Sequence, residues 1–308
     1  TGQFGFETSE LTARKMAGLL GAQPTQIQVC STGLIGEGGQ EFRSAILGAL
    51  PEAIAVASPE GGSDAAAAIM TTDTVSKTVT VDGEGWRIGG MAKGAGMLAP
   101  GLATMLVVLT TDAQIELDVA QRALRAATSV SFDRLDSDGC MSTNDQVTLM
   151  ISGAARVSPS EEAFTEALTE ACLQLAAQLL TDAEGASHDI AIRVVGAATE
   201  EDGIAVGRSV ARNNLFKAAI FGNDPNWGRV LAAIGTTSAQ FDPYQVDVSF
   251  NGVRVCTKGG PDRPRTEVDL SPRATDILID LQSGPHEVTI WTNDLTHDYV
   301  HENSAYSS

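Results

Sequence analysis

The chain has 308 residues, 43% of them hydrophobic, which is long enough to bury one large or two modest cores. Its formal net charge of −19 argues against nucleic acid and anionic membrane as partners. No apolar run reaches the length of a membrane-spanning helix and no secretory leader is visible, so we expect a cytoplasmic protein.

The first half of the chain predicts helices and strands from its hydrophobic periodicity and its turn residues. Thr8 is expected to open the first helix and Gly21 to close it, and Pro51 is expected to help end the second helix. In chain order we expect a helix from Thr8, a strand over 26–30, helices over 40–50 and 63–69, a hairpin of strands 77–81 and 86–89, a strand from Thr104 and a helix over 117–130.

The second half predicts a long amphipathic helix followed by a further set of strands and helices. Ser158-Pro-Ser-Glu161 is typical of a capping box, and Gly185 is expected to end the helix that follows. The apolar side chains of this helix recur at helical spacing and predict a stripe that faces the core: Phe164, Leu168, Cys172, Leu175 and Leu179. We expect one strand before this helix, over 146–151. After the helix we expect strands over 190–195, 216–221, 245–250, 277–281 and 287–291, and helices over 205–213 and from Trp227. This mixture predicts an α+β fold with mixed sheets in layers.

The segment from Gly89 to Asp112 carries the most informative pattern. A glycine-studded turn ends at Ala103, and Thr104 then opens the apolar run 105–109, which is typical of a buried strand. Cleavage of the Ala103–Thr104 bond would give Thr104 a free α-amine beside its hydroxyl, and such an amine can activate a threonine nucleophile. The alternative is a threonine that only begins a core strand.

Seven motifs resemble signatures of the ornithine acetyltransferase family, the bifunctional glutamate N-acetyltransferases of arginine biosynthesis, and they stand in the family's order. They are Cys30-Ser-Thr-Gly-Leu-Ile-Gly36, Ile69-Met-Thr-Thr-Asp73, Lys93-Gly-x-Gly-Met-x-x-Pro-x-x-Ala-Thr-Met-Leu106, Ser142-Thr-Asn-Asp145, Asp182-Ala-Glu-Gly185, Phe221-Gly-Asn-Asp-Pro-Asn-Trp-Gly-Arg229 and Glu302-Asn-Ser-Ala-Tyr-Ser-Ser308. The chain departs from the family pattern at Glu37-Gly-Gly-Gln-Glu-Phe42, where we expect an altered pocket rim. The family extends further at its N-terminal end, so we expect this chain to lack that segment.

The resemblance implies a self-processing enzyme with an N-terminal threonine nucleophile. Residues 1–184 would form a catalytic core of the α/β/β/α type, cut between Ala103 and Thr104 into fragments 1–103 and 104–308. Residues 185–308 would form a smaller C-terminal α+β domain whose tail returns to the active site. The family's assembly implies a heterotetramer of two copies of each fragment.

The same resemblance assigns roles to individual residues. Thr104 is the expected nucleophile, and Thr32 and Gly33 form the expected oxyanion hole. The expected substrate-binding residues are Thr71, Lys93, Thr104, Glu184, Asn303 and Ser308. Most have a physical rationale: a tight turn at Thr32-Gly33 can aim a hydroxyl and an N–H at one point, and Lys93 can pair with a substrate carboxylate. The alternatives are a structural turn and, for Glu184, a solvated charge at a helix end.

These assignments predict the transfer of an acetyl group from N2-acetylornithine to glutamate through an acetyl ester on Thr104. Acetyl-CoA is a second possible donor, and no cofactor or metal is expected, because the four cysteines form no Cys-x-x-Cys pair and the histidines lack metal-ligand spacing. Two other readings stay open. One is a self-cleaving aminopeptidase or amidase with water as the acceptor, and the other is an unprocessed, inactive homologue.

Overall fold

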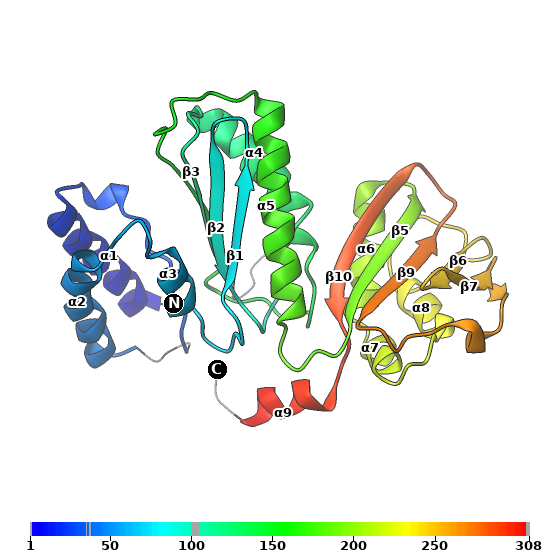
Figure 1. Cartoon of the computed structure of the whole chain (residues 1–308). Coiled ribbons are helices and arrows are strands. Elements are labelled where there is room, and N and C mark those ends of the chain that lie inside the picture. Colours follow the sequence, from blue (N-terminus) through cyan, green and yellow to red (C-terminus); the bar gives the residue numbers. More distant parts are fainter. Residues whose placement is uncertain (1, 35, 37, 100–104, 306–308) are drawn as a thin grey trace.

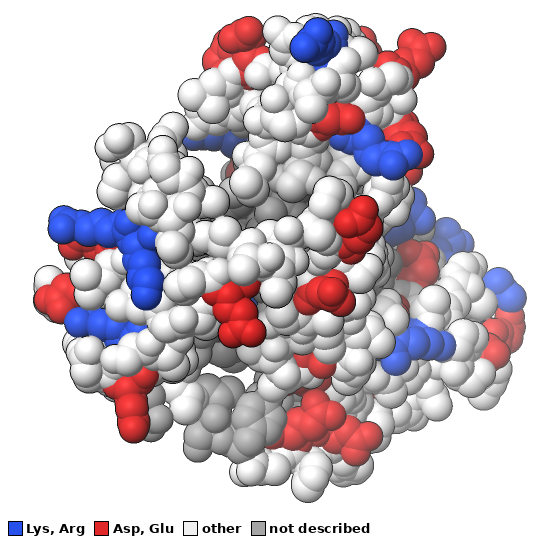
Figure 2. Space-filling view, turned by 60° about the vertical axis from the view of Figure 1, so that its left-hand side comes forward, with Lys and Arg blue, Asp and Glu red and all other residues white. Residues whose placement is uncertain are grey.

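A computed structural model describes residues 2–34, 36, 38–99 and 105–305. Figure 1 shows N-terminal helices, a first sheet with its helices and a second sheet with its helices following one another across the molecule, and a C-terminal helix that passes beneath the first sheet. Within the described part, no helix is both long and apolar enough to cross a membrane. Acidic and basic side chains lie next to one another on the face drawn in Figure 2.

The N-terminal part consists of the helices α1 (Gly2–Leu20), α2 (Gln40–Ala55) and α3 (Gly62–Ala68) with the short 3-10 helix η1 (Pro24–Gln26). The first helix begins at Gly2, before Thr8. Thr8 therefore lies inside the helix, where its hydroxyl donates to the carbonyl of Phe4 one turn earlier and caps nothing. The expected end at Pro51 is also wrong: the proline removes one backbone donor, yet α2 continues to Ala55.

The strand expected over 26–30 is absent from the described residues. The segment 27–34 has no regular secondary structure, and none of the described strands pairs with it. Alternating hydrophobicity alone therefore misled the prediction, since a strand also needs a neighbouring strand for its backbone hydrogen bonds.

The first sheet contains β1 (Lys77–Asp82), β2 (Arg87–Lys93), β3 (Leu106–Thr111) and β4 (Gln146–Ile151), in that spatial order. β1, β2 and β3 are antiparallel neighbours, whereas β3 and β4 run parallel. The hairpin, the strand after Thr104 and the strand over 146–151 are thus confirmed. The register places Lys93, at the end of β2, opposite Leu106, the first residue of β3.

Two helices cover this sheet, α4 (Leu117–Ser129) and α5 (Glu161–Thr181), with the short 3-10 helix η2 (Phe132–Arg134) after α4. The stripe predicted on α5 is confirmed, because all five of its apolar side chains have 0% exposure. The cap is Ser160 rather than Ser158: its hydroxyl accepts the Ala163 N–H at 3.1 Å, so Pro159 lies before the helix and not inside it. The helix ends at Thr181, and Gly185 follows with a φ of 61°.

The second sheet has the strand order β10-β5-β9-β6-β7-β8 and again mixes parallel and antiparallel pairs. Its strands are β5 (Asp189–Ala197), β6 (Asp247–Phe250), β7 (Val253–Thr257), β8 (Gly260–Pro261), β9 (Ala274–Asp280) and β10 (His286–Asn293). Its helices are α6 (Glu200–Ala211), α7 (Asn214–Phe221) and α8 (Trp227–Ile234), with the 3-10 helix η3 (Arg265–Glu267). The expectation of an α+β fold with mixed sheets is confirmed.

The strand expected over 216–221 is wrong, because this apolar run is the helix α7. Asn213 determines the outcome locally: its side chain accepts the Phe216 N–H at 3.0 Å and caps the helix. The strands β7 and β8 were not anticipated. Each sheet has its own hydrophobic cluster, one built from residues between 79 and 183 and the other from residues between 190 and 290.

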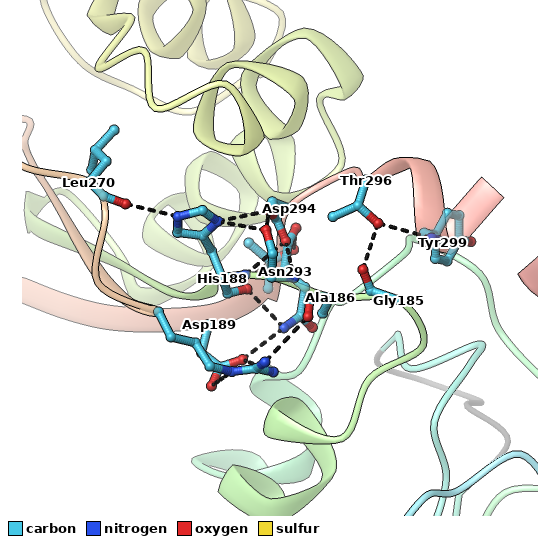
Figure 3. Close-up of polar contacts among 12 residues, drawn as sticks. Gly185, Ala186, His188, Asp189, Leu270, Asn293, Asp294, Thr296 and Tyr299 are labelled. Atoms are coloured by element: carbon cyan, nitrogen blue, oxygen red, sulfur yellow. Dashed lines mark hydrogen bonds and ion pairs between the residues drawn. The ribbon is translucent and has the colours of Figure 1, made fainter. Parts of the chain in front are cut away.

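The chain returns to the first unit through its last helix, α9 (His297–Ala305). The Thr296 hydroxyl donates to the carbonyl of Gly185 and accepts the Tyr299 N–H at 2.9 Å, as Figure 3 shows. A Cβ on Gly185 would lie 2.2 Å from the Tyr299 nitrogen. The close approach therefore needs glycine at this position, and the C-terminal helix is docked instead of frayed.

Candidate active site

A buried lysine at the end of β2 forms the first part of the site. Lys93 is 1% exposed; its Nζ donates to the Thr71 hydroxyl at 2.7 Å and lies 3.9 Å from Oδ2 of Asp73. Burial lowers the pKa of Lys93, although the Asp73 carboxylate acts in the opposite direction. Such a buried ammonium group is stabilised by anionic partners.

Asp73 does not neutralise Lys93 alone, because it also has other donors. It accepts hydrogen bonds from Lys77 Nζ at 2.7 Å, from the Gly94 N–H at 2.7 Å and from the Thr71 N–H at 3.1 Å. Burial raises the pKa of Asp73, but these donors more than offset it and hold the pKa below its usual value. Lys77 is fully buried and bonds Asp182 Oδ2 at 2.5 Å as well. This network fixes the backbone directly after Lys93, at Gly94.

Glu184 and Asn303 lie beside this network. The Asn303 Nδ2 donates to Glu184 Oε2 at 3.0 Å, and the Glu184 N–H donates to the Ala95 carbonyl at 3.0 Å. A Cβ on Gly96 would meet the Glu184 carboxylate at 2.6 Å, so this glycine lets the loop pass close to it. The negative charge of Glu184 acts to raise the pKa of Lys93. The structure thus brings together four of the predicted substrate-binding residues: Thr71, Lys93, Glu184 and Asn303.

Thr32 and Gly33 line a cavity of about 440 Å³ between the loop after η1 and the N-terminal helices. Phe4 of α1, Phe42 of α2 and Asn144 also line it. Phe42 belongs to the segment that departs from the family pattern, and it lines this cavity. The altered pocket rim stays a prediction.

The central residues of the expected site, Ala103, Thr104 and Ser308, lie outside the described residues. Their described neighbours are firmly held on both sides. The Met105 N–H donates to Asp145 Oδ1 at 2.9 Å, and the Leu98 carbonyl accepts the Ser137 N–H at 2.7 Å. Neither Asp145 nor Ser137 was singled out from the sequence, although Asp145 ends one of the seven motifs.

A second buried cluster secures the approach to the C-terminal helix. His188 Nδ1 lies 2.8 Å from Asp294 Oδ2, and its Nε2 lies 2.9 Å from the Leu270 carbonyl (Figure 3). The Ser187 hydroxyl also lies 3.0 Å from Nδ1, and it donates to the same Asp294 carboxylate. Among the residues that the structure describes, no cluster of three or more His, Cys, Asp or Glu could hold a metal ion.

Comparison with known proteins identifies the family. A sequence model described as "ArgJ family" matches residues 1–308. The chain belongs to the ArgJ family. It is 58% identical over 308 residues to the arginine biosynthesis bifunctional protein ArgJ of Streptomyces avermitilis and 55% identical to that of Thermobifida fusca, in each case over all of this chain and 80% of the relative. The family resemblance stated from the seven motifs is thus confirmed.

A solved ArgJ structure supports the fold. The crystal structure of the arginine biosynthesis bifunctional protein ArgJ of Bacillus halodurans matches with a TM-score of 0.61 at 33% identity, over 65% of this chain and 98% of that chain. The expected mixed α+β class is therefore found in an ArgJ relative as well as in the described sheets.

Proposed function

We propose that the protein moves an acetyl group from N2-acetylornithine to glutamate through an acetyl ester on Thr104. Membership of the ArgJ family makes the chain an acyltransferase of arginine biosynthesis, as the motifs predicted. The observation that supports the substrate class is the Glu184 carboxylate, which lies against the loop that directly follows Lys93. An amino-acid substrate carries a carboxylate for Lys93 and an amino group for Glu184.

The chemistry begins with cleavage of the chain. The Thr104 hydroxyl attacks the carbonyl carbon of Ala103, the C–N bond breaks, and the hydroxyl proton ends on the nitrogen of Thr104. Water then hydrolyses the ester and leaves a free carboxylate on Ala103 and a free α-amine on Thr104.

Transfer then uses two half-reactions. The α-amine of Thr104 takes the proton of the Thr104 hydroxyl. The hydroxyl oxygen then attacks the acetyl carbonyl carbon of acetylornithine. The Thr32 hydroxyl and the Gly33 N–H donate to the oxyanion that develops, and ornithine leaves with the proton on its nitrogen. The amine of glutamate attacks the acetyl ester in turn and releases acetylglutamate, which returns the hydroxyl of Thr104.

Further parts of the proposal concern organisation. We place the domain boundary at 184/185, which is supported by the two separate hydrophobic clusters. Fragments 1–103 and 104–308 pair and assemble as a heterotetramer in the cytoplasm. The reaction needs no metal or cofactor. Acetyl-CoA serves as an additional acetyl donor. Ser308 completes the substrate site with Thr71, Lys93, Glu184 and Asn303.

Denaturing electrophoresis and a paired incubation test the proposal. On the gel we expect two bands of unequal size, from a chain cut before Thr104. In the incubation we expect acetylglutamate only when acetylornithine and glutamate are both present. Acetate release without glutamate would instead identify an amidase, and one uncut band without activity would identify an inactive homologue. Thr104→Ala should abolish cleavage and transfer, while Thr104→Ser retains part of both.

A further inference from the structure

Two consecutive side chains before β4 contact both halves of the proposed site. The Asn144 Nδ2 donates to the carbonyl of Ser31 at 2.8 Å, directly before Thr32. The Asp145 Oδ1 accepts the N–H of Met105 at 2.9 Å, directly after Thr104. Because consecutive Cα atoms are about 3.8 Å apart, one short piece of backbone fixes the spacing between these contacts.

The contact to Ser31 is the main restraint on an otherwise irregular segment. Residues 27–34 form no helix or strand, and Ser31 is exposed. Among the described residues, the Asn144 bond is the one hydrogen bond that joins 28–34 to another part of the chain. A turn with so few backbone restraints depends on that bond for its placement.

The contact to Met105 is equally specific. Asp145 accepts the Met105 N–H, and the next residue, Gln146, donates its own N–H to the Met105 carbonyl at 3.0 Å. The second carboxylate oxygen of Asp145 is buried and finds no partner among the described residues. Burial raises the pKa of Asp145 to about 6 against the effects of Met105 and Lys93. A buried carboxylate at this position carries a free-energy cost that an amide or an apolar side chain would avoid.

We propose that Asn144 and Asp145 are positioning residues that hold the turn of Thr32 and Gly33 in register with the first residues of β3. The proposal rests on the proposed function, in which that turn donates to the oxyanion and Thr104 is the nucleophile. Oxyanion donors act only within about 3 Å of the oxygen, and a displacement of about 1 Å costs roughly 100-fold in rate. The Asn144–Asp145 pair sets that distance from outside the reacting groups.

A mutant cycle between Asn144→Ala and Thr32→Ala tests the first contact. We expect Asn144→Ala to lower kcat about 10- to 100-fold while KM for acetylornithine changes less than about 3-fold, because the loss is confined to the transition state. In the Thr32→Ala background the Asn144→Ala change should cost less than it does in the wild type, because Asn144 acts through that turn and only the Gly33 N–H remains to be displaced. Gln178→Ala is the matched control: it also removes a side-chain amide bond to a backbone carbonyl, that of Thr78 at 3.0 Å, and should keep the wild-type kcat.

An unchanged kcat in Asn144→Ala, or independent effects that multiply in the double variant, would overturn the proposal. If Asn144→Ala fails to fold, Asn144→Asp replaces it: this variant keeps the size but loses the donor to Ser31, and we expect the same loss of kcat with a wild-type melting temperature.

The second contact is tested by Asp145→Asn, with self-cleavage as the readout. We expect cleavage to slow at least about 10-fold, because the Met105 N–H loses its charged acceptor. Asp112→Asn is the control, since Asp112 accepts the Arg87 N–H at 2.7 Å just beyond the opposite end of β3. Wild-type cleavage in Asp145→Asn would refute this half. An uncut wild-type chain, or a Thr32→Ala variant with full activity, would instead refute the proposed function itself.

Discussion

Asn303 and Glu184 are 119 positions apart in the chain, yet Nδ2 of Asn303 donates a hydrogen bond to Oε2 of Glu184 at 3.0 Å. The bond joins the C-terminal helix to the loop after α5. The carboxylate is 8% exposed and lies against the loop that follows Lys93. The C-terminal helix is therefore part of the candidate site, and we expect its docking to affect substrate binding.

Removal of the Asn303 amide should weaken substrate binding. A hydrogen bond to a charged group contributes about 1.5–3 kcal/mol, so Asn303→Ala should raise KM for acetylornithine by roughly 10-fold or more. Steady-state kinetics on the processed enzyme measure this effect. Ser304→Ala is the control, because among the described residues its hydroxyl donates a hydrogen bond to the His301 carbonyl within the same helix. An unchanged KM in Asn303→Ala would show that the bond does not contribute to binding.

A methyl group at position 185 should displace the C-terminal helix. Gly185 has a φ of 61°, and an added Cβ would lie 2.2 Å from the Tyr299 nitrogen, so Gly185→Ala has to move α9. We expect faster amide hydrogen exchange over 297–305 and a loss of kcat/KM of about 10-fold or more. Gly48→Ala in α2 is the control: nothing lies within 4 Å of its Cβ, and it should be neutral or stabilising. Wild-type exchange in Gly185→Ala would contradict the docked helix.

The Asp294 carboxylate, which bonds His188, should make the free energy of unfolding depend on pH in the acid range. Burial raises the pKa of Asp294, but hydrogen bonds from Ser187 and His188 outweigh it and lower the pKa below its usual value. A depressed carboxylate pKa stabilises the fold above the unfolded-state pKa of about 4, and this contribution is lost as pH falls through the folded-state value.

Asp294→Asn should therefore lower the free energy of unfolding at pH 7 by about 1.5–3 kcal/mol, because the hydrogen bonds from Ser187 and His188 lose their charged acceptor. The difference from wild type should shrink as pH falls below about 4. Denaturant unfolding at several pH values measures both effects, with the exposed Glu84→Gln as a control that should follow the wild-type curve. A difference that stays constant with pH would contradict a stabilising role of the Asp294 charge.

A strained residue before the scissile segment provides a rescue experiment. Met97 has a φ of 53°, which is unfavourable for a side chain, and its N–H donates to Asp138 Oδ2 at 2.8 Å. We expect Asp138→Ala to slow self-cleavage about 10-fold, because Met97 then leaves this conformation. Adding Met97→Gly should restore part of the rate, since glycine adopts a positive φ without strain.

The chain contains a matched pair for this test. Lys258 has a φ of 51°, and its N–H donates to Asp247 Oδ1 at 2.8 Å on the second sheet. Asp247→Ala, with or without Lys258→Gly, should leave cleavage unchanged. Failure of Met97→Gly to rescue Asp138→Ala would show that Asp138 acts in another way.

Sequence patterns predicted those elements in which local and tertiary preferences agree. The stripe on α5 was correct because its five apolar side chains recur at helical spacing and meet the sheet. The run 216–221 was wrong, since a short apolar segment fits a strand or a helix, and the cap at Asn213 decides between them. The segment 26–30 alternates like a strand but has no partner strand among the described residues.

The candidate site was only partly predictable. The motifs identified Lys93 and Glu184, and the structure places Glu184 against the loop that follows Lys93. The sequence did not indicate that Lys77 bonds both Asp73 and Asp182, because a pairing across 105 positions is set by the packing of α5 on β1. The roles of Asn144 and Asp145 also depend on contacts between distant segments.

The antiparallel pairing of β2 with β3 has a consequence for the mature protein. If the chain is cut before Thr104, as we propose, β2 belongs to one polypeptide and β3 to the other, while six paired positions, from Ile88 opposite Thr111 to Lys93 opposite Leu106, still join them. The two polypeptides therefore share one continuous sheet, and neither can leave without exposing the interior of the other. They should copurify under native conditions and dissociate only in denaturant.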